Sequence, residues 1–163
     1  MKTKISATVI ALFFLMACGS SDQSKTEEEK QPEVAAPSLK FKLKASNMMY
    51  VAINADSLLV ANQSDPTKAE VFERIILENG KVAIKASSGR FISDNRVNNS
   101  VVDVIREQAL AWEEFELIAI DDVAVNIRSS TGKYVSANYA QGDILMAISD
   151  KPSTWETFTL ETK

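Results

Sequence analysis

From Leu39 to the end of the chain, short apolar stretches alternate with polar turns. Within a stretch the apolar residues occupy every second position, as in Phe41, Leu43 and Ala45, and the same alternation begins again at Phe115. A period of two places apolar side chains on one face of an extended chain, which is typical of a half-buried strand. The pattern therefore predicts an all-β domain built from short strands.

The apolar stretches recur at an almost constant interval. Trp155-Glu156-Thr157-Phe158 follows Trp112-Glu113-Glu114-Phe115 by 43 residues, and that motif follows Ala69-Glu70-Val71-Phe72 by another 43. A period of about forty residues marks repeated supersecondary units that share one core. We therefore predict three units, residues 39–79, 80–121 and 122–163. Four apolar places agree between them: Phe41–Leu43, Val82–Ile84 and Val123–Val125; Tyr50, Phe91 and Tyr134; Leu58–Leu59, Val101–Val102 and Ile144–Leu145; Phe72, Phe115 and Phe158.

Four apolar places per unit predict twelve strands. Two segments also fit a short helix. Val104 to Trp112 has room for a turn or two, and Thr67 to Arg74 resembles a helix over a single window. The repeat decides the second case in favour of a strand, because the equivalent residues around Phe115 and Phe158 have the pattern of a strand.

The first seventeen residues have the pattern of an export signal. Lys2 and Lys4 precede a nearly apolar run of thirteen residues, Ile5 to Ala17. A membrane-spanning helix needs about 20 residues, so the run is too short to span and fits the apolar region of a signal peptide. Its end, residues 15–19, resembles the lipobox of bacterial lipoproteins. The resemblance implies lipidation of Cys18, and the alternative is an ordinary signal peptide with a chance cysteine.

Residues 18–38 are predicted to be a lipidated cysteine followed by a disordered tether. The segment is rich in Ser, Glu, Lys, Gln, Pro and Ala, and it lacks the apolar side chains that a core requires. Glu27 to Glu29 is either a solvating run or an acidic export signal like that of surface lipoproteins in the Bacteroides group. Gly19 is not the aspartate that retains enteric lipoproteins in the inner membrane. These resemblances imply an outer-membrane lipoprotein, facing the periplasm or the cell surface.

Composition excludes several kinds of site. The sequence has no histidine, its single cysteine is Cys18, and 18 Lys and Arg stand against 22 Asp and Glu. Intrachain disulfides, His or Cys-rich metal sites, and nucleophilic dyads or triads that need His are therefore excluded. The mildly acidic balance argues against nucleic acid as a partner. We expect no cofactor and no metal.

A carboxylate enzyme is the remaining catalytic possibility. Two carboxylates about 5–10 Å apart can hydrolyse a glycosidic bond, and Glu113 with Glu114 or Asp121 with Asp122 are the candidates. Neighbouring residues on a strand point to opposite faces, however. We therefore predict that the protein is not an enzyme.

Two motifs resemble the fascin-like group of β-trefoil proteins. These are Gly89-Arg90-Phe91-Ile92-Ser93, which recurs as Gly132-Lys133-Tyr134-Val135-Ser136, and the Trp-Glu-x-Phe motif of the second and third units. The first unit departs from the pattern, with Met48-Met49 before Tyr50 and Ala69 in place of tryptophan. The resemblance implies a pseudo-threefold barrel of three four-stranded repeats, closed so that few strand edges remain unpaired.

In such a barrel, equivalent residues of the three units are expected to meet in layers. We predict one layer of the three repeated phenylalanines and a second from one of two equivalent sets. Trp112 and Trp155 are expected to cover the bottom of the barrel as core residues rather than to stack on a ligand. The layers proposed are Phe72, Phe115 and Phe158, then either Phe41, Val82 and Val123 or Leu43, Ile84 and Val125.

The β-trefoil resemblance implies a binding module, because these domains generally recognise glycans or proteins through their loops. The Gln-x-Trp triplet of the ricin-type lectins is absent from the sequence. Glycan binding and protein binding therefore both stay open, with a slight preference for glycan, and a plain envelope spacer is a third possibility. The domain is expected to be monomeric, with the membrane as its partner through the lipid.

If a glycan binds, we expect it at the turn that contains Tyr139. Tyr139 has Ala55 and Arg96 at the equivalent places, so the barrel does not need an aromatic there, and a tyrosine on a polar loop can stack on a sugar. Asn138, Gln141 and Asp143 would supply hydrogen bonds. The alternative is that Asn138, like Asn54 and Asn95, is an Asx-type turn residue.

Overall fold

The computed structural model describes residues 38–137, 140 and 142–162. In these residues the chain forms the predicted twelve strands and three short 3₁₀ turns. The strands are β1 Leu39–Ala45, β2 Tyr50–Ile53, β3 Leu59–Gln63, β4 Phe72–Ile76, β5 Val82–Lys85, β6 Phe91–Asn95, β7 Val101–Arg106, β8 Phe115–Ala119, β9 Ala124–Ser129, β10 Tyr134–Ala137, β11 Leu145–Ser149 and β12 Thr157–Thr162. The 3₁₀ turns are η1 Pro66–Lys68, η2 Arg96–Asn98 and η4 Thr154–Glu156.

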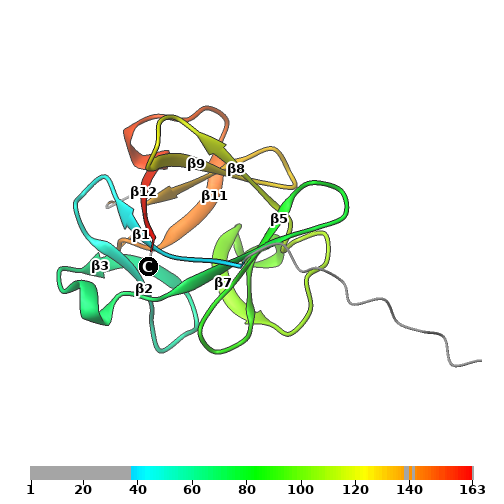
Figure 1. The fold of residues 1–163 in the computed structure, drawn as a ribbon, viewed down its shortest axis with the longest axis horizontal. Coiled ribbons are helices and arrows are strands. Elements are labelled where there is room, and N and C mark those ends of the chain that lie inside the picture. Colours follow the sequence, from blue (N-terminus) through cyan, green and yellow to red (C-terminus); the bar gives the residue numbers. More distant parts are fainter. Residues whose placement is uncertain (1–37, 138–139, 141, 163) are drawn as a thin grey trace, which may run out of the picture. The chain divides into compact units, whose positions relative to one another are not determined.

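Six of the strands close into a barrel. Antiparallel pairing runs from β1 to β4, β5, β8, β9 and β12, and β12 pairs with β1 again. The other six strands form three hairpins, β2–β3, β6–β7 and β10–β11, one from each unit. In Figure 1 the labels of β1, β2 and β3 lie at the left, that of β5 at the right, and those of β9, β11 and β12 of the third unit at the top. A six-stranded barrel with three hairpins in pseudo-threefold arrangement is a β-trefoil.

The three hairpins are joined by a repeated backbone contact. Ser57, Ser100 and Asp143 all have a positive φ, between 55° and 62°. The carbonyl oxygen of each accepts a hydrogen bond from a strand of another unit: Ser57 from the N–H of Val104, Ser100 from Ala147 and Asp143 from Ala61, at 2.8–2.9 Å. The third contact joins the last unit to the first, so the ring of hairpins is closed.

The repeated phenylalanines form the centre of the core, as predicted. Phe72, Phe115 and Phe158 are fully buried and belong to one apolar cluster. Leu43, Ile84 and Val125 are buried in the same cluster, whereas Val123 of the alternative layer is 53% exposed. Val123 lies in the link between the second and third units, before β9 begins. The carboxylate of Asp121 accepts hydrogen bonds from the N–H groups of Val123 and Ala124, which holds this link as a turn.

The expectation that both tryptophans are core residues is wrong. Trp112 is half-buried and Trp155 is 41% exposed. Both tryptophans stand before the closing strands, where the alternation of a strand does not apply: Trp155 is in η4, and Trp112 is in a turn before β8. In Trp-Glu-x-Phe, the Glu and the Phe are two residues apart and both are buried, as Glu113 and Phe115 show. The tryptophan precedes that Glu by one residue and lies on the outer side, in the loop before the closing strand.

The two helical alternatives are absent from the described residues. The segment from Thr67 forms only the end of η1, and its phenylalanine begins β4. Val104 to Arg106 is the end of β7, and the residues after it form turns. No helix of the described residues is both long and apolar enough to cross a membrane.

Candidate functional site

The loop in which a glycan site was predicted is only partly described. Asn138, Tyr139 and Gln141 lie outside the described residues, as does Cys18. Asp143 is described, and its carbonyl oxygen makes the contact with Ala61 given above. Glycan binding at this loop therefore stays a prediction.

The turn function proposed for the repeated asparagines is confirmed at two of the three positions. The side-chain oxygen of Asn54 accepts hydrogen bonds from the N–H groups of Asp56 and Leu58, at 3.0 and 2.9 Å. The side-chain oxygen of Asn95 accepts one from the N–H of Asn98, at 3.1 Å. These contacts hold the turns of the hairpins.

Departures from the repeat gather in the second unit, around Trp112. The barrel is made by residues that recur, so residues found in one unit alone are candidates for function. Six such departures precede Trp112 in the chain: Asp94 for Ile53 and Ala137, Arg96 for Ala55 and Tyr139, Asp103 for Val60 and Met146, Arg106 for Gln63 and Ser149, Ala109 for Pro66 and Pro152, and Leu110 for Thr67 and Ser153. We call residues 106–113 the Trp112 loop.

The Trp112 loop lacks the 3₁₀ turn that the equivalent loops of the first and third units contain. Pro66 begins η1, where Asp65 caps the turn through the N–H of Thr67, and Pro152 stands shortly before η4. The second unit has Ala109 at the equivalent place, and its loop contains turns but no 3₁₀ helix. Proline fixes φ near −65°, so its absence removes a constraint that favours such a turn. The loop instead encloses a depression of about 580 Å³.

The lining of the depression is mainly apolar, with charged groups around it. The apolar part comes from Leu110, whose side chain is 67% exposed, and from Ala111 and Trp112. Arg106, Glu107, Gln108 and Glu113 complete the lining. Ligand sites commonly have volumes of roughly 300–1,000 Å³ and combine apolar walls with a few polar groups. The depression has both properties.

Two guanidinium groups lie against the Trp112 ring. The central carbons of Arg96 and Arg106 are each 5.6 Å from the ring centre. A cation within about 6 Å of an indole ring is attracted by its quadrupole. Both arginines belong to the second unit alone, so the cationic surroundings of this ring do not come from the repeat.

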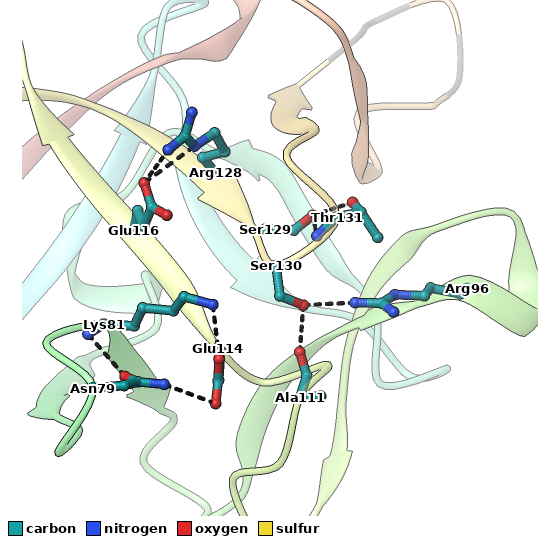
Figure 2. A network of polar contacts seen from close by, with 10 residues as sticks. All are labelled: Asn79, Lys81, Arg96, Ala111, Glu114, Glu116, Arg128, Ser129, Ser130 and Thr131. Carbon is teal, nitrogen blue, oxygen red and sulfur yellow. Dashed lines mark hydrogen bonds and ion pairs between the residues drawn. The ribbon is translucent and has the colours of Figure 1, made fainter.

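Arg96 is held by residues from both sides of a unit boundary. One of its terminal amino groups donates to the Oγ of Ser130, at 2.6 Å, and its Nε lies 3.8 Å from the buried carboxylate of Asp94. Figure 2 shows that Ser130, from the turn after β9, also donates to the carbonyl oxygen of Ala111 in the Trp112 loop. The third unit therefore fixes the position of both Arg96 and the loop.

Glu113 has a structural position and is almost fully buried. Its Oε2 accepts a hydrogen bond from the N–H of Leu110, at 2.8 Å, and its Oε1 lies 3.9 Å from the Nε of Arg106. The equivalent Glu156 accepts from the N–H of Ser153 at 2.8 Å, and Glu70 accepts from the N–H of Ser87 at 2.7 Å. The repeated glutamate thus satisfies backbone donors in all three units.

Glu114 points away from this arrangement, as predicted from the alternation of a strand. It pairs with Lys81 at 2.9 Å and accepts a hydrogen bond from Asn79, and Figure 2 shows both contacts. The hydrogen bond from Lys81 lowers the pKa of the Glu114 carboxyl. The two adjacent glutamates are therefore engaged with separate partners.

Two further carboxylates are buried in the β6–β7 hairpin. Asp94 and Asp103 are 0% and 3% exposed, and one oxygen of each has no hydrogen-bond partner among the described residues. Burial raises the pKa of Asp103, although the hydrogen bond from Asn95 and the charge of Arg106 oppose this shift. No group of three or more His, Cys, Asp or Glu in the described part of the chain is arranged to hold a metal ion.

Comparison with known proteins gives the fold independently. No family model matches the chain, and no curated protein matches it. Among solved structures, the BEL β-trefoil is similar with a TM-score of 0.65 and 17% identity, over 81% of this chain and 98% of the other. SeviL bound to an asialo-GM1 saccharide gives a TM-score of 0.58 and 13% identity, over 76% and 97%.

A longer enzyme also contains a similar domain. The endo-β-galactosidase from Clostridium perfringens that releases GlcNAcα1-4Gal has a TM-score of 0.62 and 6% identity, over 77% of this chain. This chain spans only 32% of that enzyme. At such low identity, these similarities establish the β-trefoil fold and leave function to the site itself.

The sequence contains a signal for the Trp112 site in its departures from the repeat. Aligning the three units identifies Arg96, Arg106 and Leu110 as departures, by the same comparison that singled out Tyr139. Trp112 itself was assigned to the core because it recurs as Trp155. The convergence of Arg96, Ser130 and the loop on this ring depends on the tertiary structure.

Proposed function

We propose that the protein is a lipid-anchored binding module of the bacterial cell envelope that recognises a carbohydrate at the Trp112 loop. The observation that carries the proposal is the convergence of second-unit departures on one indole beside a depression of about 580 Å³. The residues that recur in all three units build the barrel, so the barrel does not require these departures. Ligand recognition accounts for them.

The chemistry of the depression suits a sugar. A pyranose has a face of C–H groups, which packs on apolar or aromatic side chains such as Leu110 and Trp112, and a rim of hydroxyls that need polar partners. Gln108 and Arg106 can donate hydrogen bonds to hydroxyl oxygens, and Glu107 can accept them. The saccharide bound to SeviL supports the proposal by analogy of fold only.

A protein partner is the second candidate, and one observation favours it. Trp112, two arginines and the exposed Leu110 form a group of the residue types that dominate protein interfaces. In this alternative the depression would accept an apolar side chain. A non-catalytic structural role in the envelope predicts binding of neither class of ligand.

The proposal includes anchoring through Cys18, export by residues 1–17 and placement at the outer membrane. We propose in addition that the protein is not an enzyme. The support for this is that Glu113 is committed to the N–H of Leu110, while Glu114 is paired with Lys81 on the other side.

The test is a glycan array probed with the full-length chain in mild detergent. Glycans that bind would then be titrated into wild type, Trp112→Ala and Trp155→Ala, with the denaturation midpoint of each variant checked. We expect Trp112→Ala to lose at least tenfold in affinity and Trp155→Ala, the equivalent tryptophan of the third unit, to bind like wild type.

Two other outcomes would favour a different site or a different class of partner. A loss only in Tyr139→Ala would move the site to the loop predicted from the sequence. An empty array combined with specific capture of one envelope protein, lost in Trp112→Ala, would favour the protein partner.

A further inference from the structure

We propose that the ligand of the Trp112 loop carries a carboxylate, so that the protein binds acidic saccharides, and that Arg106 recognises this group. The inference rests on the proposed carbohydrate function and adds the chemical class of the sugar. It is carried by the geometry of one side chain, Arg106, which lies against Trp112 and lines the depression, and by the contrast between that side chain and Arg96 and Arg128.

The guanidinium of Arg106 is held in one direction, but its N–H groups have no hydrogen-bond acceptor among the described residues. Its guanidinium lies against the Trp112 ring, and its Nε lies 3.9 Å from the Oε1 of Glu113. Among the described residues this guanidinium donates no hydrogen bond, and the side chain is 43% exposed. The ring and Glu113 therefore fix the direction of the group, while its terminal amino groups keep their donors.

Two other arginines of the domain, Arg96 and Arg128, donate side-chain hydrogen bonds. Arg128 donates from its Nε and from one terminal amino group to the carboxylate of Glu116, as Figure 2 shows. Arg96 donates to Ser130 and lies beside Asp94, which is fully buried and balances its charge. The contrast matters because a guanidinium that is already paired has less to offer a ligand.

The free donors of Arg106 match a carboxylate better than a hydroxyl. Two parallel N–H groups of a guanidinium fit the two oxygens of a carboxylate in a fork, and such charge-assisted bonds are roughly twice as strong as neutral ones. A hydroxyl accepts from one N–H at a time. The apolar residues Leu110, Ala111 and Trp112, which would pack on a sugar ring, belong to the same lining as Arg106.

Two acidic groups of the lining leave room for this arrangement. Glu113 faces the Nε of Arg106 and is already held by the N–H of Leu110. Glu107 is 82% exposed and lies 3.8 Å from Arg90, so its charge is paired at the surface and screened by solvent. A ligand carboxylate at the terminal amino groups of Arg106 would thus meet a guanidinium that Glu113 orients from the other edge.

The experiment compares matched saccharides on the full-length chain in mild detergent. Isothermal titration at about 50 mM salt would use a galacturonic acid trimer with its carboxyl-reduced counterpart, and sialyllactose with lactose. We expect the acidic member of at least one pair to bind ten times or more tightly than the neutral member, with a preference that weakens at 500 mM salt.

Three variants test the role of Arg106. Arg106→Gln is expected to reduce the acid preference to below threefold, because a glutamine side chain has neither the charge nor the fork of parallel N–H groups. Arg106→Lys keeps the charge but not the fork, so it should retain only part of the preference. Lys68→Gln removes a positive charge from the exposed, equivalent loop of the first unit and should change nothing.

The outcomes separate this inference from the proposed function. Equal affinity for the acidic and neutral members in wild type would overturn the carboxylate inference and leave carbohydrate binding intact. An acid preference that survives in a folded Arg106→Gln protein would also overturn it. Binding of no saccharide in the panel or on the array would overturn both.

Discussion

At the scale of single residues, the second unit shows a conflict between burial and charge. Asp103 stands where the other units have Val60 and Met146, and it is 3% exposed with one oxygen unpartnered among the described residues. A buried charge without full hydrogen bonding costs free energy. Its presence beside the Trp112 loop is understandable if the site, rather than the barrel, requires it.

This conflict gives a prediction on stability and pH. Burial raises the folded-state pKa of Asp103 above its unfolded value of about 3.9, so the folded state binds this proton more tightly. The contribution to stability is full below the unfolded pKa and is lost as pH rises through the folded pKa. Asp103→Asn should therefore stabilise the protein at pH 7, by about 1–3 kcal/mol, and gain little below pH of about 4.

Urea denaturation at the two pH values measures this effect. Asp121→Asn is the matched control with the opposite sign, because hydrogen bonds from the N–H groups of Val123 and Ala124 lower the pKa of Asp121. That variant should lose stability at pH 7. A stabilisation by Asp103→Asn that is the same at both pH values would contradict the assignment.

Cys18 carries the prediction that concerns the membrane. Acyl chains contribute about 0.8 kcal/mol of membrane affinity per buried CH₂, so Cys18→Ala should leave an uncleaved precursor or a soluble protein. Metabolic labelling with a palmitate analogue would be expected for wild type alone. Equal labelling of Cys18→Ala would show that the lipobox resemblance is accidental.

At the scale of elements, the turns before the second strand of each unit show how the first unit differs. Gly89 and Gly132 have φ of 83° and 84°, and each N–H closes a turn onto Ala86 or Ser129. In the first unit Met48 makes the same turn onto Ala45 with φ of 68°. A non-glycine residue in the left-handed region costs roughly 1–2 kcal/mol.

Met48→Gly should therefore stabilise the protein. Relief of the left-handed strain exceeds the entropy cost of glycine, which is about 0.5–1 kcal/mol, so we expect a net gain of up to about 1 kcal/mol. Met48 is 67% exposed, so little packing is lost. Thermal or urea denaturation would measure the gain. A Cβ at Gly132 meets no atom within 4 Å, so Gly132→Ala tests backbone strain alone and should destabilise.

At the scale of the whole molecule, closure holds the three units together. The barrel closes where β12 pairs with β1, from Phe41 opposite Thr162 to Ala45 opposite Phe158. The ring of backbone contacts from Ser57, Ser100 and Asp143 closes the hairpins in the same sense. Because each unit completes its pairing only with the others, the three phenylalanines share a single core.

Phe115 tests this shared core. Phe115→Ala should cost about 3–5 kcal/mol, a large part of the 5–15 kcal/mol typical of a domain. Glu114→Ala removes a surface pair with Lys81 and should cost less than about 1 kcal/mol. Chemical denaturation of both variants measures the difference. The same midpoint for the two would mean that the opposite orientations assigned to Glu114 and Phe115 are wrong.

The sequence by itself determined the fold, because a β-trefoil has two periods that can be found along the chain. Alternation of two assigns a face to each strand residue, and the interval of 43 residues shows which strands are equivalent. Both periods can be found by comparing residues along the chain, so Phe72, Phe115 and Phe158 could be placed in the core from the sequence.

The tertiary structure alone decided where the departures from the repeat meet. Arg96, Ser130 and the Trp112 loop belong to different hairpins and turns, and only the packing of the second unit against the third brings them together around one ring. The depression likewise depends on a loop conformation that no local period describes. Long-range contacts are set by closure of the whole barrel, and therefore the site, unlike the strands, had to be seen in three dimensions.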